Sequence, residues 1–183
     1  GKKIKSLVKS ERSGDLESLH AYVSGMSFSP DGRDIVFVAK SKGKEALFFH
    51  NIKDEDTYLK KRLDYYNIVS PSWSPDGSMV AFSALDRNKR DIFVYHIKDD
   101  YIEQITDDRF DDVDPVWMPD SRQIVFSSDR PHPENPTVDL AGRPFTDESL
   151  IRPGGFSYGY YNIFDVDLAR KRVSPIKVGP GEN

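Results

Sequence analysis

Pro71-Ser-Trp-Ser-Pro-Asp-Gly77, followed by Met79-Val-Ala-Phe-Ser83, is the most informative part of the sequence. Ser-Pro-Asp-Gly is typical of a type I β-turn, because Pro fixes φ at the second turn position and Asp and Gly suit the positions after it. The aromatic residue two positions before the proline ends one short strand. The run of apolar residues without clean alternation then predicts a second strand that is covered on both faces.

The same pattern occurs twice more in the chain. Met26-Ser-Phe-Ser-Pro-Asp-Gly32 precedes Asp34-Ile-Val-Phe-Val38, and Pro115-Val-Trp-Met-Pro-Asp-Ser121 precedes Gln123-Ile-Val-Phe-Ser127. The spacing is nearly constant, with 45 residues from Pro30 to Pro75 and 44 residues from Pro75 to Pro119. A period of this length indicates a repeat architecture, in which each unit needs a neighbour to bury its apolar surface.

Each unit also contains signals for two further strands. Third strands are predicted at Ala46–Ile52, Asp91–Ile97 and Asn162–Leu168, and weaker fourth strands at Leu59–Leu63, Ile102–Thr106 and Arg172–Ile176. Four short strands per repeat, each sheet lying between neighbours, are typical of a propeller blade. We therefore predict an all-β fold of three four-stranded antiparallel blades plus one extra strand at Lys3–Lys9, which makes a partial propeller. A β-sandwich is the alternative.

The predicted organisation follows from these repeats. An outer strand of a preceding blade and a connector occupy 1–21, blade 1 occupies 22–65, blade 2 occupies 66–109, blade 3 occupies 110–179 and a tail occupies 180–183. Blade 3 carries an inserted loop at 130–160, rich in Pro and Gly. Propellers close with about four to eight blades. Three blades would leave two sheet faces exposed, so we expect self-association of this partial propeller.

The repeats resemble the PD40 repeats of the TolB-like β-propeller family. The resemblance is carried by Phe28–Phe37, Trp73–Phe82 and Trp117–Phe126, and by Asp91-Ile-Phe-Val94 and Asn162-Ile-Phe164. The third unit departs from the pattern, with Met118 in place of Ser and Ser121 in place of Gly. The resemblance implies a non-catalytic module of the bacterial periplasm or cell envelope that binds a protein or peptide, with any export signal upstream of Gly1. Prolyl-oligopeptidase-type enzymes have similar propellers, so the alternative is the accessory domain of such a peptidase.

Composition argues against several other classes of function. The net charge is −4, and acidic and basic residues are interspersed apart from the Lys2–Lys9 run, so we expect no nucleic-acid partner. The chain has no Cys, which excludes disulfides and thiolate chemistry. No apolar run approaches the ~18 residues that span a bilayer, so we expect no membrane insertion.

Two segments invite a chemical interpretation. Gly155-Phe-Ser-Tyr-Gly159 fits a nucleophile elbow, but no apolar strand precedes Ser157, and all four histidines lie upstream of it, so we predict no catalytic residue. The acidic segment Asp107–Asp114 lacks the spacing of an EF-hand loop. We predict no metal or cofactor, and calcium binding by this segment stays open as an alternative.

The candidate binding residues lie on the edge of the propeller that carries the insertion. Strand order places the inserted loop on the same edge as the connections between blades, such as 107–114. Rigid strands would then present loops at this edge for binding. The candidate residues are Asp86, Arg87, Asp111, Asp114, Asp129, Arg130 and Tyr160.

Overall fold

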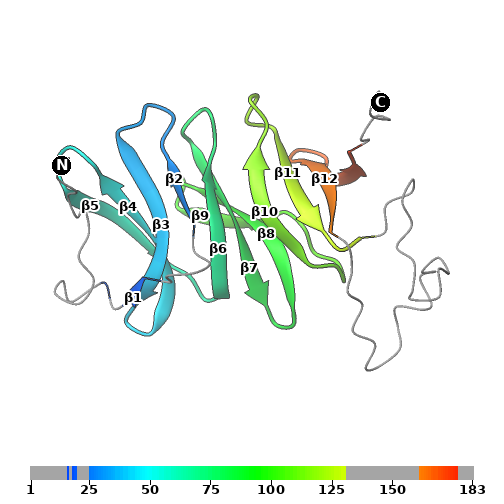
Figure 1. Cartoon of the computed structure of the whole chain (residues 1–183), viewed down its shortest axis with the longest axis horizontal. Coiled ribbons are helices and arrows are strands. Elements are labelled where there is room, and N and C mark those ends of the chain that lie inside the picture. Colours follow the sequence, from blue (N-terminus) through cyan, green and yellow to red (C-terminus); the bar gives the residue numbers. More distant parts are fainter. Residues whose placement is uncertain (1–15, 17, 20–24, 131–160, 177–183) are drawn as a thin grey trace, which may run out of the picture.

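The chain forms three antiparallel sheets that stand in a row without closing into a ring (Figure 1). The computed structural model describes residues 16, 18–19, 25–130 and 161–176. Within these residues there is no helix, and therefore none that could cross a membrane. Blade 1 contains β1 (Ser18–Leu19), β2 (Met26–Phe28), β3 (Asp34–Ser41), β4 (Lys44–Asn51) and β5 (Asp56–Arg62); blade 2 contains β6 (Tyr66–Trp73), β7 (Met79–Asp86), β8 (Lys89–His96) and β9 (Tyr101–Gln104); blade 3 contains β10 (Asp112–Trp117), β11 (Gln123–Ser128), β12 (Asn162–Asp167) and β13 (Arg172–Pro175).

The predicted fold of three four-stranded blades plus an extra strand is confirmed, and the sandwich alternative is wrong. The extra strand is β1, which pairs with Lys40 and Ala39 on the same edge of β3 that β2 occupies further along. β1 thus continues the line of the first strand of blade 1. The strand predicted at Lys3–Lys9 lies outside the described residues.

The Ser-Pro-Asp-Gly turns share one hydrogen-bonding pattern. The hydroxyl of Ser74 donates to Asp76 over 2.6 Å and accepts from the backbone N–H of Met79, and Ser29 does the same with Asp31 and Asp34. In blade 3 the turn still closes, with Ser121 N–H donating to the Met118 carbonyl over 3.0 Å. Ser121 adopts φ of +56°, where Gly is favoured, and its hydroxyl accepts from the N–H of Asp76 in blade 2.

The hydrophobic core lies between the blades. We call the side of a blade that faces the next blade along the chain its forward flank, and the opposite side its rear flank. The forward flank of blade 1 packs Val38, Leu47 and Phe49 against the rear flank of blade 2. The forward flank of blade 2 packs Ile92 and Val94 against the rear flank of blade 3. The strands are therefore covered on both faces, as their apolar runs predict.

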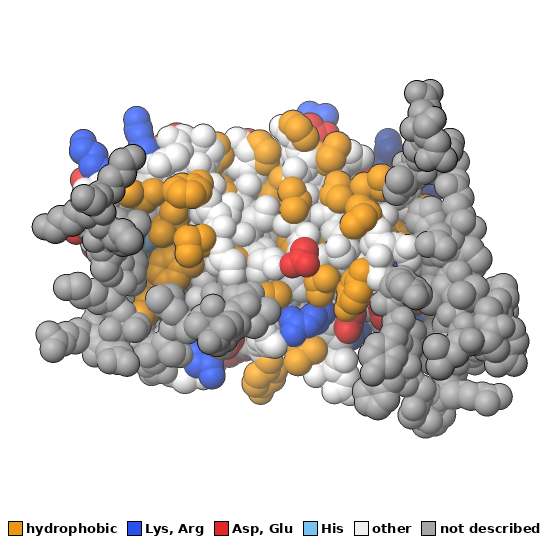
Figure 2. Space-filling view, viewed as in Figure 1, with side chains coloured by type: hydrophobic (Ala, Val, Ile, Leu, Met, Phe, Trp, Pro, Cys, Tyr) orange, Lys and Arg blue, Asp and Glu red, His pale blue; other side chains and the backbone are white. Residues whose placement is uncertain are grey.

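The two outer flanks differ from each other. We expected both to be exposed. On the rear flank of blade 1, Phe37 and Phe48 are only 4% and 2% exposed and Leu16 packs in the same cluster. Met26 and Phe28 of β2, which pair with Phe37 and Ile35 on that flank, are 67% and 61% exposed. On the forward flank of blade 3, Val116 and Ile163 are 59% and 41% exposed. On the face that Figure 2 shows, hydrophobic side chains lie at several places over the blades, with a few acidic and basic ones between them.

Candidate functional site

The candidate site is the edge of blades 2 and 3 where three loops meet, which we call the rim. It consists of the β7–β8 turn at 86–89, the connection from β9 to β10 at 105–111, and residues 128–130 at the end of β11. Lys89 donates to Asp107 over 2.8 Å, which joins the turn to the connection. The strand ends thus bring together segments that are far apart in the sequence.

Arg130 fixes the connection onto blade 3. Its guanidinium donates to both carboxylate oxygens of Asp112, one of them at 2.9 Å, and also to Asp108. Arg130 as a whole is only 7% exposed. Its guanidinium carbon lies 5.3 to 5.7 Å from the ring centroids of Phe110, Phe126 and Phe164. Bidentate pairing and cation–π contacts both favour Arg over Lys at such a position.

Burial shapes the protonation of this cluster. Burial raises the pKa of Asp112, and the hydrogen bonds and charge of Arg130 offset this effect only in part. For Arg130, burial acts to lower the pKa, but the bonds to Asp112 and Asp108 outweigh it and raise the pKa. Asp112 and Arg130 therefore form an ion pair, and removal of either residue would leave the other as an unpaired buried charge.

Asp91 is a second buried carboxylate beneath the rim. Burial raises the pKa of Asp91 to about 6, and the charges of Asp112 and Asp107 add to this effect, while Lys89 opposes it. Lys89 Nζ lies 3.6 Å from Asp91 Oδ2. Gln104 also donates to that oxygen, over 3.2 Å. The charge of Asp91 therefore changes in weakly acidic solution.

Two further predicted residues form a short chain of hydrogen bonds along the rim. The backbone N–H of Arg90 donates to Asp111 over 2.8 Å, and the backbone N–H of Asp111 donates to Asp129 over 2.9 Å. These bonds tie β8, the connection and the end of β11 to one another. The structure therefore brings Asp111, Asp129 and Arg130 together.

The other predicted residues are more dispersed. Asp86 and the exposed Arg87 lie at the β7–β8 turn, whereas Asp114 lies further along β10 and accepts from the hydroxyl of Ser70 over 2.6 Å. Tyr160 lies outside the described residues, as do the Gly155–Gly159 motif and most of the inserted loop. Its neighbour Tyr161 is exposed, and burial together with the charges of Asp111 and Asp129 raises the pKa of its phenol.

Sequence reasoning missed the residues that organise the rim from beneath. Asp91, Asp108 and Asp112 are central to the network, but Asp108 and Asp112 were considered only as members of the acidic run. The available signal was Arg130, a single cation that ends the run Ser127-Ser-Asp-Arg130 and would need a carboxylate if it were buried. The run of acids at 107–114 supplies that partner. In the described segments no group of three or more His and acidic side chains is arranged to hold a metal ion.

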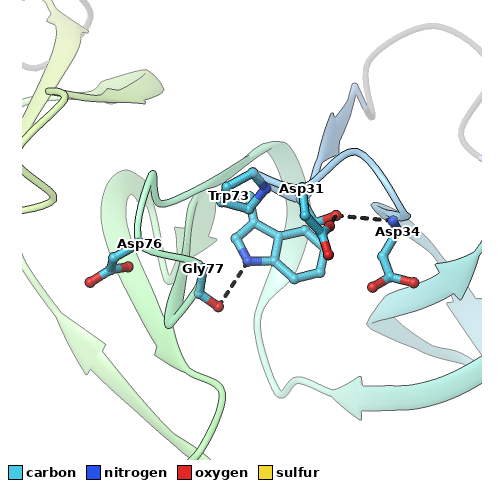
Figure 3. A pocket seen from close by; sticks show the side chains of 7 residues that line it. Asp31, Asp34, Trp73, Asp76 and Gly77 are labelled. Carbon is cyan, nitrogen blue, oxygen red and sulfur yellow. Dashed lines mark hydrogen bonds between the residues drawn. The ribbon is translucent and has the colours of Figure 1, made fainter.

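A notch of about 300 Å³ lies at the opposite edge, between the turns of blades 1 and 2 (Figure 3). It is lined by Trp73, Pro30 and three carboxylates, those of Asp31, Asp34 and Asp76. The turns already use these groups: Asp34 accepts from Asn51 over 2.7 Å, and the indole N–H of Trp73 donates to the Gly77 carbonyl. Figure 3 shows Asp76 pointing away from the indole. The notch is a product of turn geometry and does not gather converging groups.

Comparison with known families agrees with this architecture. The model of the PD40 family, described as the TolB β-propeller domain, matches residues 13–134. The chain belongs to the TolB β-propeller family. No curated protein sequence matches the chain at the significance that we required.

The solved structures that resemble this TolB-type propeller chain are longer than the chain itself. A putative TolB from Agrobacterium tumefaciens aligns with a TM-score of 0.56 and 18% identity, over 83% of this chain and 48% of that one. The β-propeller domain of the Trilobed protease from Pyrococcus furiosus aligns with a TM-score of 0.53 and 14% identity, over 86% of this chain and 42% of that one. An acylaminoacyl peptidase from Pyrococcus horikoshii aligns with a TM-score of 0.52 and 18% identity, over 83% of this chain and 24% of that one. The chain thus spans less than half of each, and the likeness establishes the fold alone.

Proposed function

We propose that this chain is a non-catalytic module that binds a protein or peptide at the rim, within a TolB-like propeller of the bacterial cell envelope. The observation that supports the proposal is the Arg130 network. Arg130 fixes the connection onto blade 3 and Lys89 joins the β7–β8 turn to the connection, so that the three loops are held while charged and aromatic side chains stay at the surface. A platform that is ordered before binding loses less conformational entropy when a partner docks.

The exposed chemistry of the rim suits a polar polypeptide. Arg87 and Tyr161 are exposed at this edge, and Tyr and Arg are the residues that most often anchor protein interfaces. Asp107 adds an exposed carboxylate held by Lys89. This mixture of both charges favours a peptide or loop over a polyanion or an apolar ligand. The envelope location rests on the TolB resemblance.

A second function is favoured by the solved structures. The acylaminoacyl peptidase from Pyrococcus horikoshii contains a segment of similar fold, and this chain covers 24% of it. The chain would then be the accessory propeller of a prolyl-oligopeptidase-type peptidase. A catalytic serine in a strand–turn–helix elbow elsewhere in the same polypeptide would decide for this alternative, and further PD40 repeats alone would decide for the binding module.

The rim is tested with a double variant, Arg87→Ala with Tyr161→Ala. The matched control is Arg33→Ala with Tyr101→Ala, which removes an exposed Arg and an exposed Tyr at the opposite edge of the blades. Immobilised proteins are incubated with bacterial envelope extract, bound proteins are quantified by mass spectrometry, and the affinity of each recovered partner is measured by calorimetry. We expect the rim variant to lose at least tenfold in affinity and the control to bind like the wild type. Equal binding by both variants would rule out the rim.

A further inference from the structure

Two fully buried carboxylates lie beneath the rim, and their partners differ. Asp91 and Asp112 are both 0% exposed. Asp112 accepts two hydrogen bonds from the guanidinium of Arg130, which makes a complete ion pair. The cation beside Asp91 is Lys89, whose Nζ lies 3.6 Å from Oδ2, longer than a hydrogen bond. A buried carboxylate that is compensated so weakly takes up a proton more readily than one in a complete pair.

Lys89 binds the connection between β9 and β10 more closely than it binds Asp91. Its ammonium group donates to Asp107 over 2.8 Å and also to the carbonyl of Asp108. The side chain of Asp107 is exposed, so this bond lies at the surface. The charge of Lys89 is therefore shared between a buried and an exposed carboxylate, and it offsets the burial of Asp91 only in part. Burial thus raises the pKa of Asp91 to about 6.

The end of β9 and the connection cover Asp91 with long hydrogen bonds. Gln104 Nε2 donates to Oδ2 over 3.2 Å, and the hydroxyl of Thr106 lies 3.5 Å from Oδ1. This hydroxyl accepts a hydrogen bond from the N–H of Ile92 over 2.9 Å and also bonds to Asp112. Because a hydroxyl has a single hydrogen, it cannot donate to both carboxylates at once. The segment that keeps water from Asp91 therefore gives its charge little support.

The acidic groups around Asp91 add to this effect. Asp107 of the connection and Asp112 of β10 both act on Asp91, and their charges raise its pKa further. The charge of Arg130, from the end of β11, is directed at Asp112. On β7, the residue that pairs with Asp91 is Ala84, which is uncharged. Lys89 is thus the group of this cluster that favours the charged form of Asp91.

The other two blades have neutral residues at the position of Asp91. Asn162 in blade 3 pairs with Ser128 as Asp91 pairs with Ala84, and Ala46 occupies the same place in blade 1. Each of these residues directly precedes an equivalent isoleucine or leucine of the third strand. A blade therefore accepts Asn at this position, and the buried charge is a feature of blade 2 and not of the repeat.

We propose that Asp91 is a proton-controlled latch for the β9–β10 connection, which closes over the neutral carboxyl group in weak acid and opens more often at neutral pH, where opening gives the carboxylate access to water. The closed state binds the proton more tightly than an open state in which Asp91 has its ordinary pKa near 3.9, so a rise in pH favours opening. The open state stays a minor one, as in other local openings of folded proteins. The latch is a property of the fold and does not depend on the proposed function.

The latch is tested by amide hydrogen exchange of the full chain, measured by NMR at pH 5 and pH 7 and corrected for the intrinsic pH dependence of exchange. The reporters are Ile105 and Thr106, whose N–H groups donate to the carbonyl of Ile92, next to Asp91. Their protection should fall about tenfold from pH 5 to pH 7, given the pKa of Asp91 in the two states. Low concentrations of urea should leave this exchange unchanged at pH 7, which marks a local opening. Protection that is equal at both pH values, or exchange that occurs only through global unfolding, would overturn the proposal.

Asp91→Asn removes the titrating group and uses the residue that blade 3 has at this position. Its reporter amides should keep at pH 7 the protection that the wild type has at pH 5. The matched control is Asp54→Asn, at an exposed aspartate of blade 1, which should retain the pH dependence of the wild type. An NMR titration of the Asp91 carboxyl carbon in the wild type, expected to have its midpoint at about 6, provides a test without any variant. A midpoint near 4, or an Asp91→Asn protein that retains the pH dependence, would refute the latch.

Discussion

The guanidinium of Arg130 donates to both carboxylate oxygens of Asp112, so that the end of β11 is tied to the start of β10 inside the protein. This pair has a structural cost and a structural use. Keeping two charges away from water costs free energy. The pair also fixes the connection between blades 2 and 3 in one position. A buried ion pair adds little net stability, whereas removal of one partner is strongly destabilising.

Removal of Arg130 should therefore destabilise blade 3 strongly. We expect Arg130→Met to lower the free energy of unfolding by about 3 to 5 kcal/mol, because Asp112 is left buried without a partner. Adding Asp112→Leu should recover much of that loss. Urea unfolding followed by tryptophan fluorescence measures the change. Arg122→Met, at an exposed arginine of the same blade, should stay within about 0.5 kcal/mol of the wild type.

Stability should depend on pH through Asp91. Because the pKa of Asp91 is about 6 in the folded protein and near 3.9 in the unfolded chain, the folded state binds the proton more tightly. Its contribution is fully present below pH 4 and is lost as the pH rises through 6. The difference in unfolding free energy between Asp91→Asn and the wild type should therefore change by about 2 kcal/mol in favour of the variant from pH 4 to pH 7. An equal difference at both pH values would contradict this.

Equivalent isoleucines in successive blades provide a matched pair. Ile92 is fully buried between blades 2 and 3, so Ile92→Ala should cost about 2 to 5 kcal/mol. Ile163 holds the same place on the open flank of blade 3, and Ile163→Ala should cost less than about 1 kcal/mol in the monomer. Denaturant unfolding at a concentration where the protein is monomeric checks both values. Similar costs would mean that the open flank is covered in solution.

Leu16 should contribute to the stability of blade 1. It packs against the Phe37–Phe48 pair on the rear flank of that blade. Leu16→Ala should lower the melting temperature, because apolar cover is lost. Differential scanning calorimetry measures the change, and an unchanged melting temperature would contradict this.

The repeat pattern was sufficient to predict the three blades and even the pairing across the insertion. Leu47, Ile92 and Ile163 were matched by spacing alone, and each pairs with the strand expected for it. The periodicity is informative because each blade buries equivalent apolar residues against its neighbour. The same reasoning could not find the cover on the rear flank of blade 1, since Leu16 stands outside the repeat.

The candidate site was harder to predict for a physical reason. Loop position correctly suggested that Asp111, Asp129 and Arg130 come close together. It gave no information on burial, so that Arg130 was expected at the surface although it lies among three phenylalanine rings. Whether a charged side chain is a surface group or an internal anchor depends on partners that are distant in sequence.

The hairpin of β11 and β12 keeps six consecutive residue pairs, from Gln123–Asp167 to Ser128–Asn162, although residues 129–161 separate its strands. In blade 2 the corresponding strands are joined by two residues, Arg87 and Asn88, and pair in the same register. Because the cost of closing a loop grows only slowly with its length, this hairpin is a permissive point for grafting. A foreign epitope or reporter spliced there would leave the scaffold intact, and evolution has the same freedom to diversify what the blade displays.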